Sequence, residues 1–146
     1  MTTPVERALS CFGQNFNCSQ AVFSAFAPLY GIDEKTALKL ASPFGGGFAR
    51  QGHVCGAVTG ALLAIGLARG TEGPAGKGDI YRLGQEFLHR FETEHGSLLC
   101  RTLIACDIST PEGYQQAVER GIFKTICPDL VRNAVEIAGS MLEAAA

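Results

Sequence analysis

Four cysteines, each predicted to lie at the beginning of a different helix, restrict most strongly how this chain can fold. They are Cys18, Cys55, Cys100 and Cys127, and successive members are 37, 45 and 27 residues apart. No Cys-x-x-Cys pair occurs in the sequence, which removes the thioredoxin-type motif and the common zinc-finger and zinc-ribbon patterns. These thiols can therefore form one site only if the fold brings four distant helix ends together.

The positions of these cysteines suggest chemical reactivity. A helix N-terminus has unpaired backbone N–H groups and a partial positive charge. Both favour the thiolate, which is the form that binds metal ions and attacks electrophiles. A single cysteine is more often a small buried apolar residue, and Cys11, beside Leu9 and Phe12, fits that description. Cys106 follows Cys100 by six residues and would lie on a different helical face, where it could serve as a spare or resolving thiol.

Length, charge and hydrophobicity limit the class of protein. The 146 residues fit one domain spanning 1–146, and 47% apolar residues suffice for an ordinary core. A net charge of −2 gives little support for nucleic-acid binding. The longest apolar run, residues 54–68, is shorter than the roughly 20 residues that span a membrane, and no signal-peptide pattern precedes it. We expect a cytoplasmic protein, in which six cysteines point to metal binding or redox chemistry rather than disulfides.

Capping signals and apolar periodicity predict helices along nearly the whole chain. Thr3, Asn17, Asp33, Ser97 and Thr110 are predicted N-caps, Asp79 is a candidate cap, and no segment alternates with the period of a strand. The expected helices cover about 4–13, 18–27, 34–41, 54–68 and 79–95, a short segment containing Cys100, and stretches that begin near 111 and 128. The sequence therefore predicts an all-α, compact single-domain bundle of about six to eight helices.

The predicted helix over 54–68 is apolar on almost every side and should be central. Gly56, Gly60 and Ala64 recur every four residues and make a smooth ridge that a neighbouring helix can approach closely. The neighbour could also belong to a second copy of the chain, so a homo-oligomer is one expected assembly.

The glycine-rich segment 43–52 precedes Cys55. It lacks the Gly-Lys-Ser/Thr of a P-loop and the preceding strand of a dinucleotide site. We interpret it as a flexible loop whose bare backbone lets Cys55 and a cofactor come close. Arg50 could bind a cofactor by offsetting the charge of a thiolate cluster. His53 could act as a ligand or lower a thiol pKa, but such a loop histidine is more often solvated.

Several short motifs together resemble one known family. They are Asn17-Cys18-Ser19-Gln20, Phe44-Gly45-Gly46-Gly47, Cys55-Gly56-Ala57-Val58-Thr59-Gly60, Cys100-Arg101, the run Asp107 to Gly113, and Cys127-Pro128. In order and spacing they resemble a family described as redox-active and named for its pattern C-GCAxxG-C-C. The resemblance places the family's four cysteines at Cys18, Cys55, Cys100 and Cys127 and implies a redox function. Here the order is Val54-Cys55-Gly56-Ala57 rather than Gly-Cys-Ala, so the backbone before Cys55 is expected to differ.

Three functions are compatible with these residues. The first is a small redox protein in which the four cysteines ligate an iron–sulfur cluster, [2Fe–2S] above all, and exchange electrons with a partner protein. The second is metal-free thiol–disulfide chemistry with Cys55 as the nucleophile. The third is structural zinc bound by the same four thiols. In each case we expect an electron carrier, a redox module or a structural protein rather than an enzyme that converts a substrate.

Overall fold

The computed structural model describes residues 2–144 and confirms the all-α prediction. The α-helices are α1 (Pro4–Gly13), α2 (Cys18–Phe26), α3 (Glu34–Ala41), α4 (Gly56–Arg69), α5 (Lys77–His95), α6 (Cys100–Leu103), α7 (Pro111–Glu119), α8 (Ile122–Thr125) and α9 (Cys127–Ala144). Short 3₁₀ helices cover Ala27–Tyr30, Ser42–Phe44 and Pro74–Gly76. Strand-like pairing within residues 2–144 is limited to one isolated bridge. None of the helices in that range has the length and hydrophobicity needed to cross a membrane.

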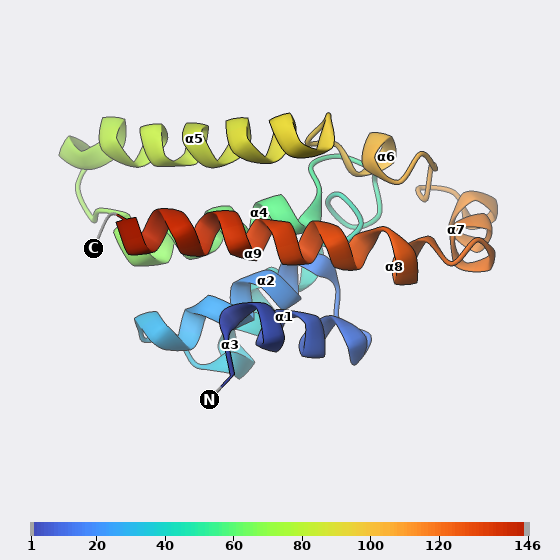
Figure 1. The fold of residues 1–146 in the computed structure, drawn as a ribbon, viewed down its shortest axis with the longest axis horizontal. Coiled ribbons are helices and arrows are strands. Elements are labelled where there is room, and N and C mark those ends of the chain that lie inside the picture. Colours follow the sequence, from blue (N-terminus) through green and yellow to red (C-terminus); the bar gives the residue numbers. More distant parts are fainter. Residues whose placement is uncertain (1, 145–146) are drawn as a thin grey trace.

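The helices form layers around α9, which crosses the middle of the molecule (Figure 1). α5 lies on one side of α9, and α1 and α2 lie on the other side. α4 runs behind α9 in this view and packs against α2, α5 and α9. The short helices α6, α7 and α8 gather at the end of the molecule where α9 begins. This arrangement places the first residues of α2, α4, α6 and α9 in the same part of the molecule.

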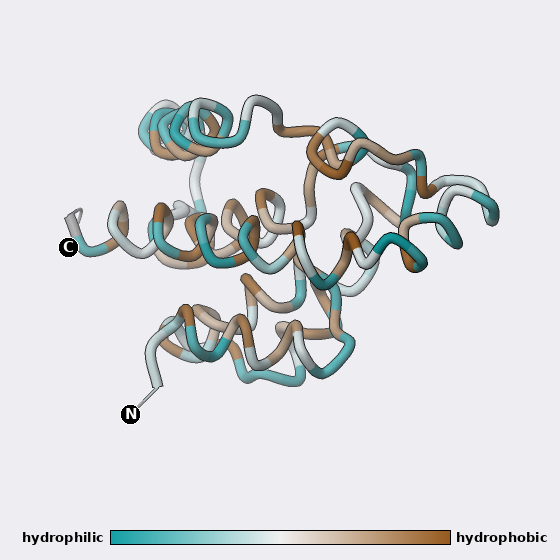
Figure 2. Tube along the Cα trace, turned by 45° about the vertical axis from the view of Figure 1, so that its right-hand side comes forward, coloured by the Kyte–Doolittle hydropathy of each residue, from teal (hydrophilic) through white to brown (hydrophobic). Residues whose placement is uncertain are grey.

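Two groups of buried side chains hold these layers together. The larger group, called the main core here, includes the fully buried Val22, Val58, Phe87, Phe91 and Val131. The smaller group, called the end cluster, consists of Cys100, Ile104, Ile108, Ala117, Ile122 and Cys127. In Figure 2 the hydrophobic residues of α5 lie on the side that faces the rest of the molecule, as expected for an amphipathic helix over a core.

The glycine ridge of α4 packs against α2 within the same chain. A Cβ atom at Gly60 would lie 2.7 Å from the Ser19 carbonyl oxygen, and one at Gly56 would lie 3.1 Å from the Ser19 nitrogen. Both glycines and Ala64 are buried. The ridge thus explains the close approach of α2 and α4, and it is not available to a second copy of the chain.

Local signals located most helices, but not every boundary. The N-caps Thr3, Asn17, Asp33 and Thr110 accept hydrogen bonds from backbone N–H groups as predicted. Asp79 and Ser97 were also proposed as N-caps, and neither residue caps a helix. The short helix α8 was not predicted. α5 begins at Lys77, so Asp79 lies in its first turn. Ser97 accepts a hydrogen bond from the Leu99 N–H, and α6 begins only at Cys100.

Candidate functional site

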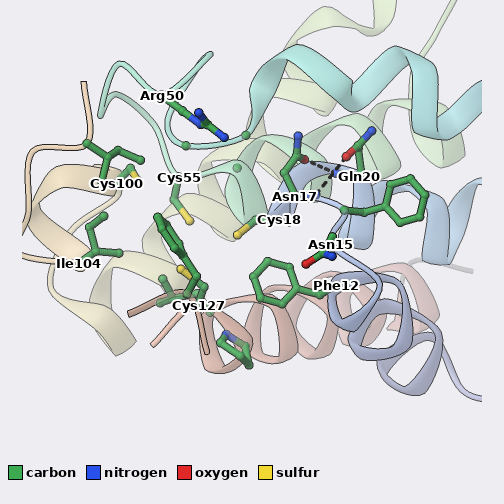
Figure 3. Close-up of a pocket in the computed structure, with 18 of the residues that line it drawn as sticks. Phe12, Asn15, Asn17, Cys18, Gln20, Arg50, Cys55, Cys100, Ile104 and Cys127 are labelled. Carbon is green, nitrogen blue, oxygen red and sulfur yellow. Dashed lines mark hydrogen bonds between the residues drawn. The ribbon is translucent and has the colours of Figure 1, made fainter. Parts of the chain in front are cut away.

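The four cysteines singled out from the sequence line one cavity of about 980 Å³. Cys18, Cys100 and Cys127 are the first residues of α2, α6 and α9, and Cys55 immediately precedes α4. Figure 3 shows the sulfur atoms of Cys18, Cys55 and Cys127 directed toward a common space, with Cys100 beside them. The fold therefore brings together thiols that are far apart in the sequence.

A short backbone bridge places Cys55 beside Cys100. Val54 and Leu99 form an isolated antiparallel bridge. The Cys100 N–H donates to the His53 carbonyl at 2.6 Å, and the Cys55 N–H donates to the segment before Cys100 at 2.8 Å. The sequence predicted no strand. A single bridge has no alternation of apolar and polar residues, so the sequence alone could not have indicated it. Cys55 and Cys100 are called the bridged pair below.

Cys18 and Cys127 form a second pair. Hydrogen bonding between the two thiols is the largest cause that raises the pKa of Cys18 well above its ordinary value and lowers the pKa of Cys127. Burial adds to the increase at Cys18. Of the two, Cys127 therefore ionises first. These residues are called the hydrogen-bonded pair below.

Burial dominates the protonation of the bridged pair. It raises the pKa of Cys55 to about 11, although the N–H groups of Ala57 and Val58 oppose the shift without making a capping hydrogen bond to the side chain. Burial, with the neighbouring charges of Cys55 and Cys127, raises the pKa of Cys100 to about 12. The lowered pKa of Cys127 comes from its interaction with Cys18 rather than from the start of α9. At Cys55 and Cys100 desolvation outweighs any effect of the helix terminus, so the expectation that a helix start favours a thiolate is not met there.

The glycine-rich segment is a compact turn rather than the flexible loop that was predicted. Residues 46–50 all have positive φ, between 51° and 68°, and include the non-glycine residues Phe48, Ala49 and Arg50. The N–H of Gly52 bonds to the Gly46 carbonyl at 3.1 Å and closes the turn. Five consecutive residues in this conformation form a left-handed helical turn, which costs roughly 1–2 kcal/mol for each non-glycine residue. The strain marks a segment that the surrounding structure holds firmly.

Gly47 lets this turn approach Cys100. A Cβ atom at Gly47 would lie 2.7 Å from the Cys100 Cβ and 2.5 Å from the His53 nitrogen. Sequence reasoning predicted a close approach to Cys55, whereas the closest cysteine to this glycine is Cys100. Arg101 fixes the far end of the turn by donating hydrogen bonds to the carbonyls of Gln51 and Gly52 at 2.9 and 3.2 Å.

Arg50 lines the cavity, as Figure 3 shows. Its guanidinium carbon lies 4.0 Å from the centroid of the Tyr114 ring, and the guanidinium donates a hydrogen bond to the Tyr114 hydroxyl at 3.2 Å. Tyr114 stacks in turn on Phe123, with 5.6 Å between ring centroids. Sequence reasoning missed both aromatic residues, since nothing in the sequence links α7 to a loop 64 residues earlier.

The remaining candidates lie outside this cavity. His53 is exposed, and its ring lies 6.1 Å from that of Phe48. Cys11 packs against the main core and accepts a hydrogen bond from the Ser24 hydroxyl at 3.8 Å. Cys106 lies beyond the end of α6, and its thiol donates to the Gly113 carbonyl at 3.4 Å.

No three-ligand group of histidine, cysteine, aspartate or glutamate side chains for a single metal ion is found in residues 2–144. Four thiolates around a tetrahedral zinc ion would require such a group. The cavity contains the bridged pair and the hydrogen-bonded pair, and the pKa of each bridged-pair thiol is raised by the neighbouring Cys127 as well as by burial.

Taken together, the fold and the cavity define a helical protein with four convergent thiols. Over residues 16–141 the chain matches the model of the family described as "Putative redox-active protein (C_GCAxxG_C_C)", and it belongs to that family. The resemblance found in the motifs is therefore confirmed, and with it the redox class of the protein. No curated protein and no solved structure matches the chain significantly.

Proposed function

We propose that this is a redox protein in which Cys18, Cys55, Cys100 and Cys127 hold a [2Fe–2S] cluster. The observation that carries the proposal is that four distant cysteines line one cavity as two pairs. In clusters of this type two thiolates ligate each iron. When bound, such a cluster takes up and releases one electron, and the protein would pass that electron to or from a partner protein.

The donor set fits a cluster better than a single ion. Four sulfur donors are the usual ligands of iron–sulfur clusters. Two pairs suit two irons, whereas one zinc ion needs its ligands around one centre, and no group of three is so arranged within residues 2–144. Structural zinc is therefore the weaker candidate.

The chain's own residues would prepare this site in three ways. Burial of Cys55 and Cys100 keeps water away, so their protons leave only when a cation compensates the thiolate charge. The bare backbone of Gly47 and Gly56 allows the loop and α4 to lie against the side chains of Cys100 and Cys18. Arg50, on the wall of the cavity, would offset part of the negative charge of four thiolates.

Metal analysis of anaerobically purified protein tests the proposal. We expect brown protein with equal amounts of iron and acid-labile sulfide. Replacing any of the four cavity cysteines by serine should lower the iron content, whereas Cys11→Ser and Cys106→Ser should leave it unchanged. Protein without iron and sulfide after cluster reconstitution would contradict the proposal.

A second candidate function is thiol–disulfide exchange by the hydrogen-bonded pair. What supports it is the contact of Cys18 with the more acidic thiol of Cys127, which makes Cys127 a better nucleophile than the buried Cys55. The Cys127 thiolate would attack oxidised glutathione and release one glutathione thiol. Cys18 would then displace the second glutathione, so that two protein thiols are oxidised and two glutathione thiols are formed.

Thiol counting on metal-free protein distinguishes this candidate. Mild oxidation should remove two thiols per chain, and peptide mapping should find Cys18 bonded to Cys127. An unchanged thiol count would exclude disulfide formation, and iron and sulfide analysis would still decide the first proposal independently.

A further inference from the structure

The cavity extends well beyond the four thiols. Its volume of about 980 Å³ lies at the upper end of the roughly 300–1,000 Å³ that is typical of pockets for small organic molecules. In Figure 3, Phe12 and Asn15 lie on the side of the cavity away from Cys100. Cys18 is the labelled cysteine nearest to this second side, which leaves room for a molecule other than the groups that the thiols would hold.

Aromatic rings form much of the apolar wall. Phe12, Phe16, Tyr114 and Phe123 all line the cavity, and each is only half-buried. A ring that faces a cavity leaves apolar surface in contact with water, and a flat apolar ligand would cover that surface. The wall is therefore suited to a molecule with an aromatic ring system.

The charge on the wall is positive. Arg50 and Lys124 are the charged residues that line the cavity, and no carboxylate lines it. Within residues 2–144 neither cation forms an ion pair with a carboxylate. Cations without a carboxylate partner beside an apolar cavity favour an anionic group on the ligand.

Arg50 is held in place before any ligand binds. Its backbone belongs to the strained left-handed turn, and its guanidinium rests on the Tyr114 ring. The hydrogen bond from Arg50 to the Tyr114 hydroxyl uses one of the five guanidinium N–H donors. The remaining N–H groups can donate hydrogen bonds to an anion without a costly rearrangement, since the side chain is already oriented.

We propose that the cavity binds an aromatic anion, which is a small molecule with a flat ring system and a carboxylate, phosphate or sulfonate group. The ring packs against the aromatic wall, and the anionic group contacts Arg50, with Lys124 adding to the positive potential. The proposal rests on the proposed redox function in one respect, which is that the bound molecule would be an electron donor or acceptor. Binding itself needs no cluster.

Two matched dyes test the proposal with the purified full chain. 8-Anilinonaphthalene-1-sulfonate carries the anionic group, and N-phenyl-1-naphthylamine has the same rings without it. One charge-assisted contact corresponds to about tenfold in affinity, so the sulfonate dye should bind about tenfold more tightly. Arg50→Gln should raise the Kd of the sulfonate dye about tenfold and leave that of the neutral dye unchanged. Arg82→Gln, on the exposed face of α5, should change neither Kd.

Further variants keep the test decisive if the turn tolerates no change at Arg50. Lys124→Gln should weaken the sulfonate dye alone, and Phe12→Ala should weaken both dyes, with circular dichroism checking the helical fold. Failure of both dyes to bind, or equal binding of the sulfonate dye by wild type, Arg50→Gln and Lys124→Gln, would overturn the proposal. Iron and sulfide content are measured separately, so the loss of one proposal does not imply the loss of the other.

Discussion

The main core and the end cluster differ in how many helices support them. The main core takes side chains from α1 to α5 and from α9, whereas the end cluster depends on the one-turn helices α6 and α8 together with α7 and the first residue of α9. Isolated helices of one or two turns are unstable in water and need tertiary contacts. We therefore expect the end cluster to open more readily than the main core.

The cavity cysteines lie where these two regions meet. Cys55 belongs to the main core, Cys100 and Cys127 belong to the end cluster, and Cys18 packs against both. A group that is held by all four thiols would therefore join a stable region to a less stable one. Binding in the cavity should therefore stabilise α6–α8 more than it stabilises α4 or α5.

The same substitution placed in each region gives the largest expected effect. Ile65 in the main core and Ile122 in the end cluster are 2% and 6% exposed. Ile65→Ala should lower the free energy of unfolding by about 2–5 kcal/mol, because it leaves a cavity among long helices. Ile122→Ala should lower it by less than half as much, while amide exchange in α7 and α8 becomes faster. Chemical denaturation and hydrogen exchange measure both effects, and equal global losses would show that the two regions unfold as one unit.

A methyl group at Gly60 tests the packing inside the main core. Gly60→Ala should lower the free energy of unfolding by about 1–3 kcal/mol, since the added Cβ would lie 2.7 Å from the Ser19 carbonyl oxygen. Gly66→Ala on the same helix is the control, because no atom lies within 4 Å of its added Cβ. That change should be neutral or stabilising by up to about 1 kcal/mol, as alanine favours the helix. Stability should be followed by urea denaturation.

The pH dependence of stability tests the burial of the Cys55 thiol. Burial raises the pKa of Cys55 from 9.0 to about 11, so in reduced, metal-free protein the unfolded chain loses this proton first as the pH rises. Stability from this thiol is complete below pH 9 and is lost toward pH 11, at up to about 1.4 kcal/mol per pH unit. Cys55→Ala should flatten this decline in urea titrations at several pH values. Cys127→Ala should also flatten the decline, because Cys127 contributes to the raised pKa values of Cys18, Cys55 and Cys100.

The contact between Arg50 and Tyr114 should give the smallest effect. Tyr114→Phe keeps the ring beneath the guanidinium but removes the hydroxyl that accepts a hydrogen bond at 3.2 Å. We expect a loss of about 0.5–1 kcal/mol at most, because the bond is partly exposed. Tyr114→Ala should cost more, since the stacking on Phe123 is lost as well. Thermal unfolding of the two variants compares the contribution of the hydrogen bond with that of the ring contacts. Equal losses of stability in the two variants would assign the whole effect to the hydrogen bond.

Sequence reasoning succeeded where a signal is local. Thr3, Asn17, Asp33 and Thr110 cap helices through their own side chains, so a few neighbouring residues sufficed to place α1, α2, α3 and α7. The apolar character of residues 54–68 likewise indicated a central α4, and the glycine ridge indicated that a neighbouring helix approaches it closely. The selection of the four cysteines used the same local signals, and their gathering in one cavity is consistent with it.

Sequence reasoning failed where the structure depends on contacts between residues that are distant in the sequence. The Val54–Leu99 bridge delays the start of α6, and no residue near Ser97 indicates this. The left-handed turn contains Phe48 and Ala49, which rarely adopt positive φ, so only the surrounding hydrogen bonds fix it. The protonation of the thiols was also beyond local reasoning, because the helix terminus is visible in the sequence but the extent of burial is not.

The separation of the cysteines also bears on the order of events during protein synthesis. Cys127 follows Cys18 by 109 residues, and each of the two pairs joins segments far apart in the chain. A growing chain that has passed Cys100 still lacks one wall of the cavity. A group that binds all four thiols can therefore gain its last ligand only after translation has passed the first residue of α9. The two pairs would thus be completed in order, with the bridged pair available before Cys127 is synthesised.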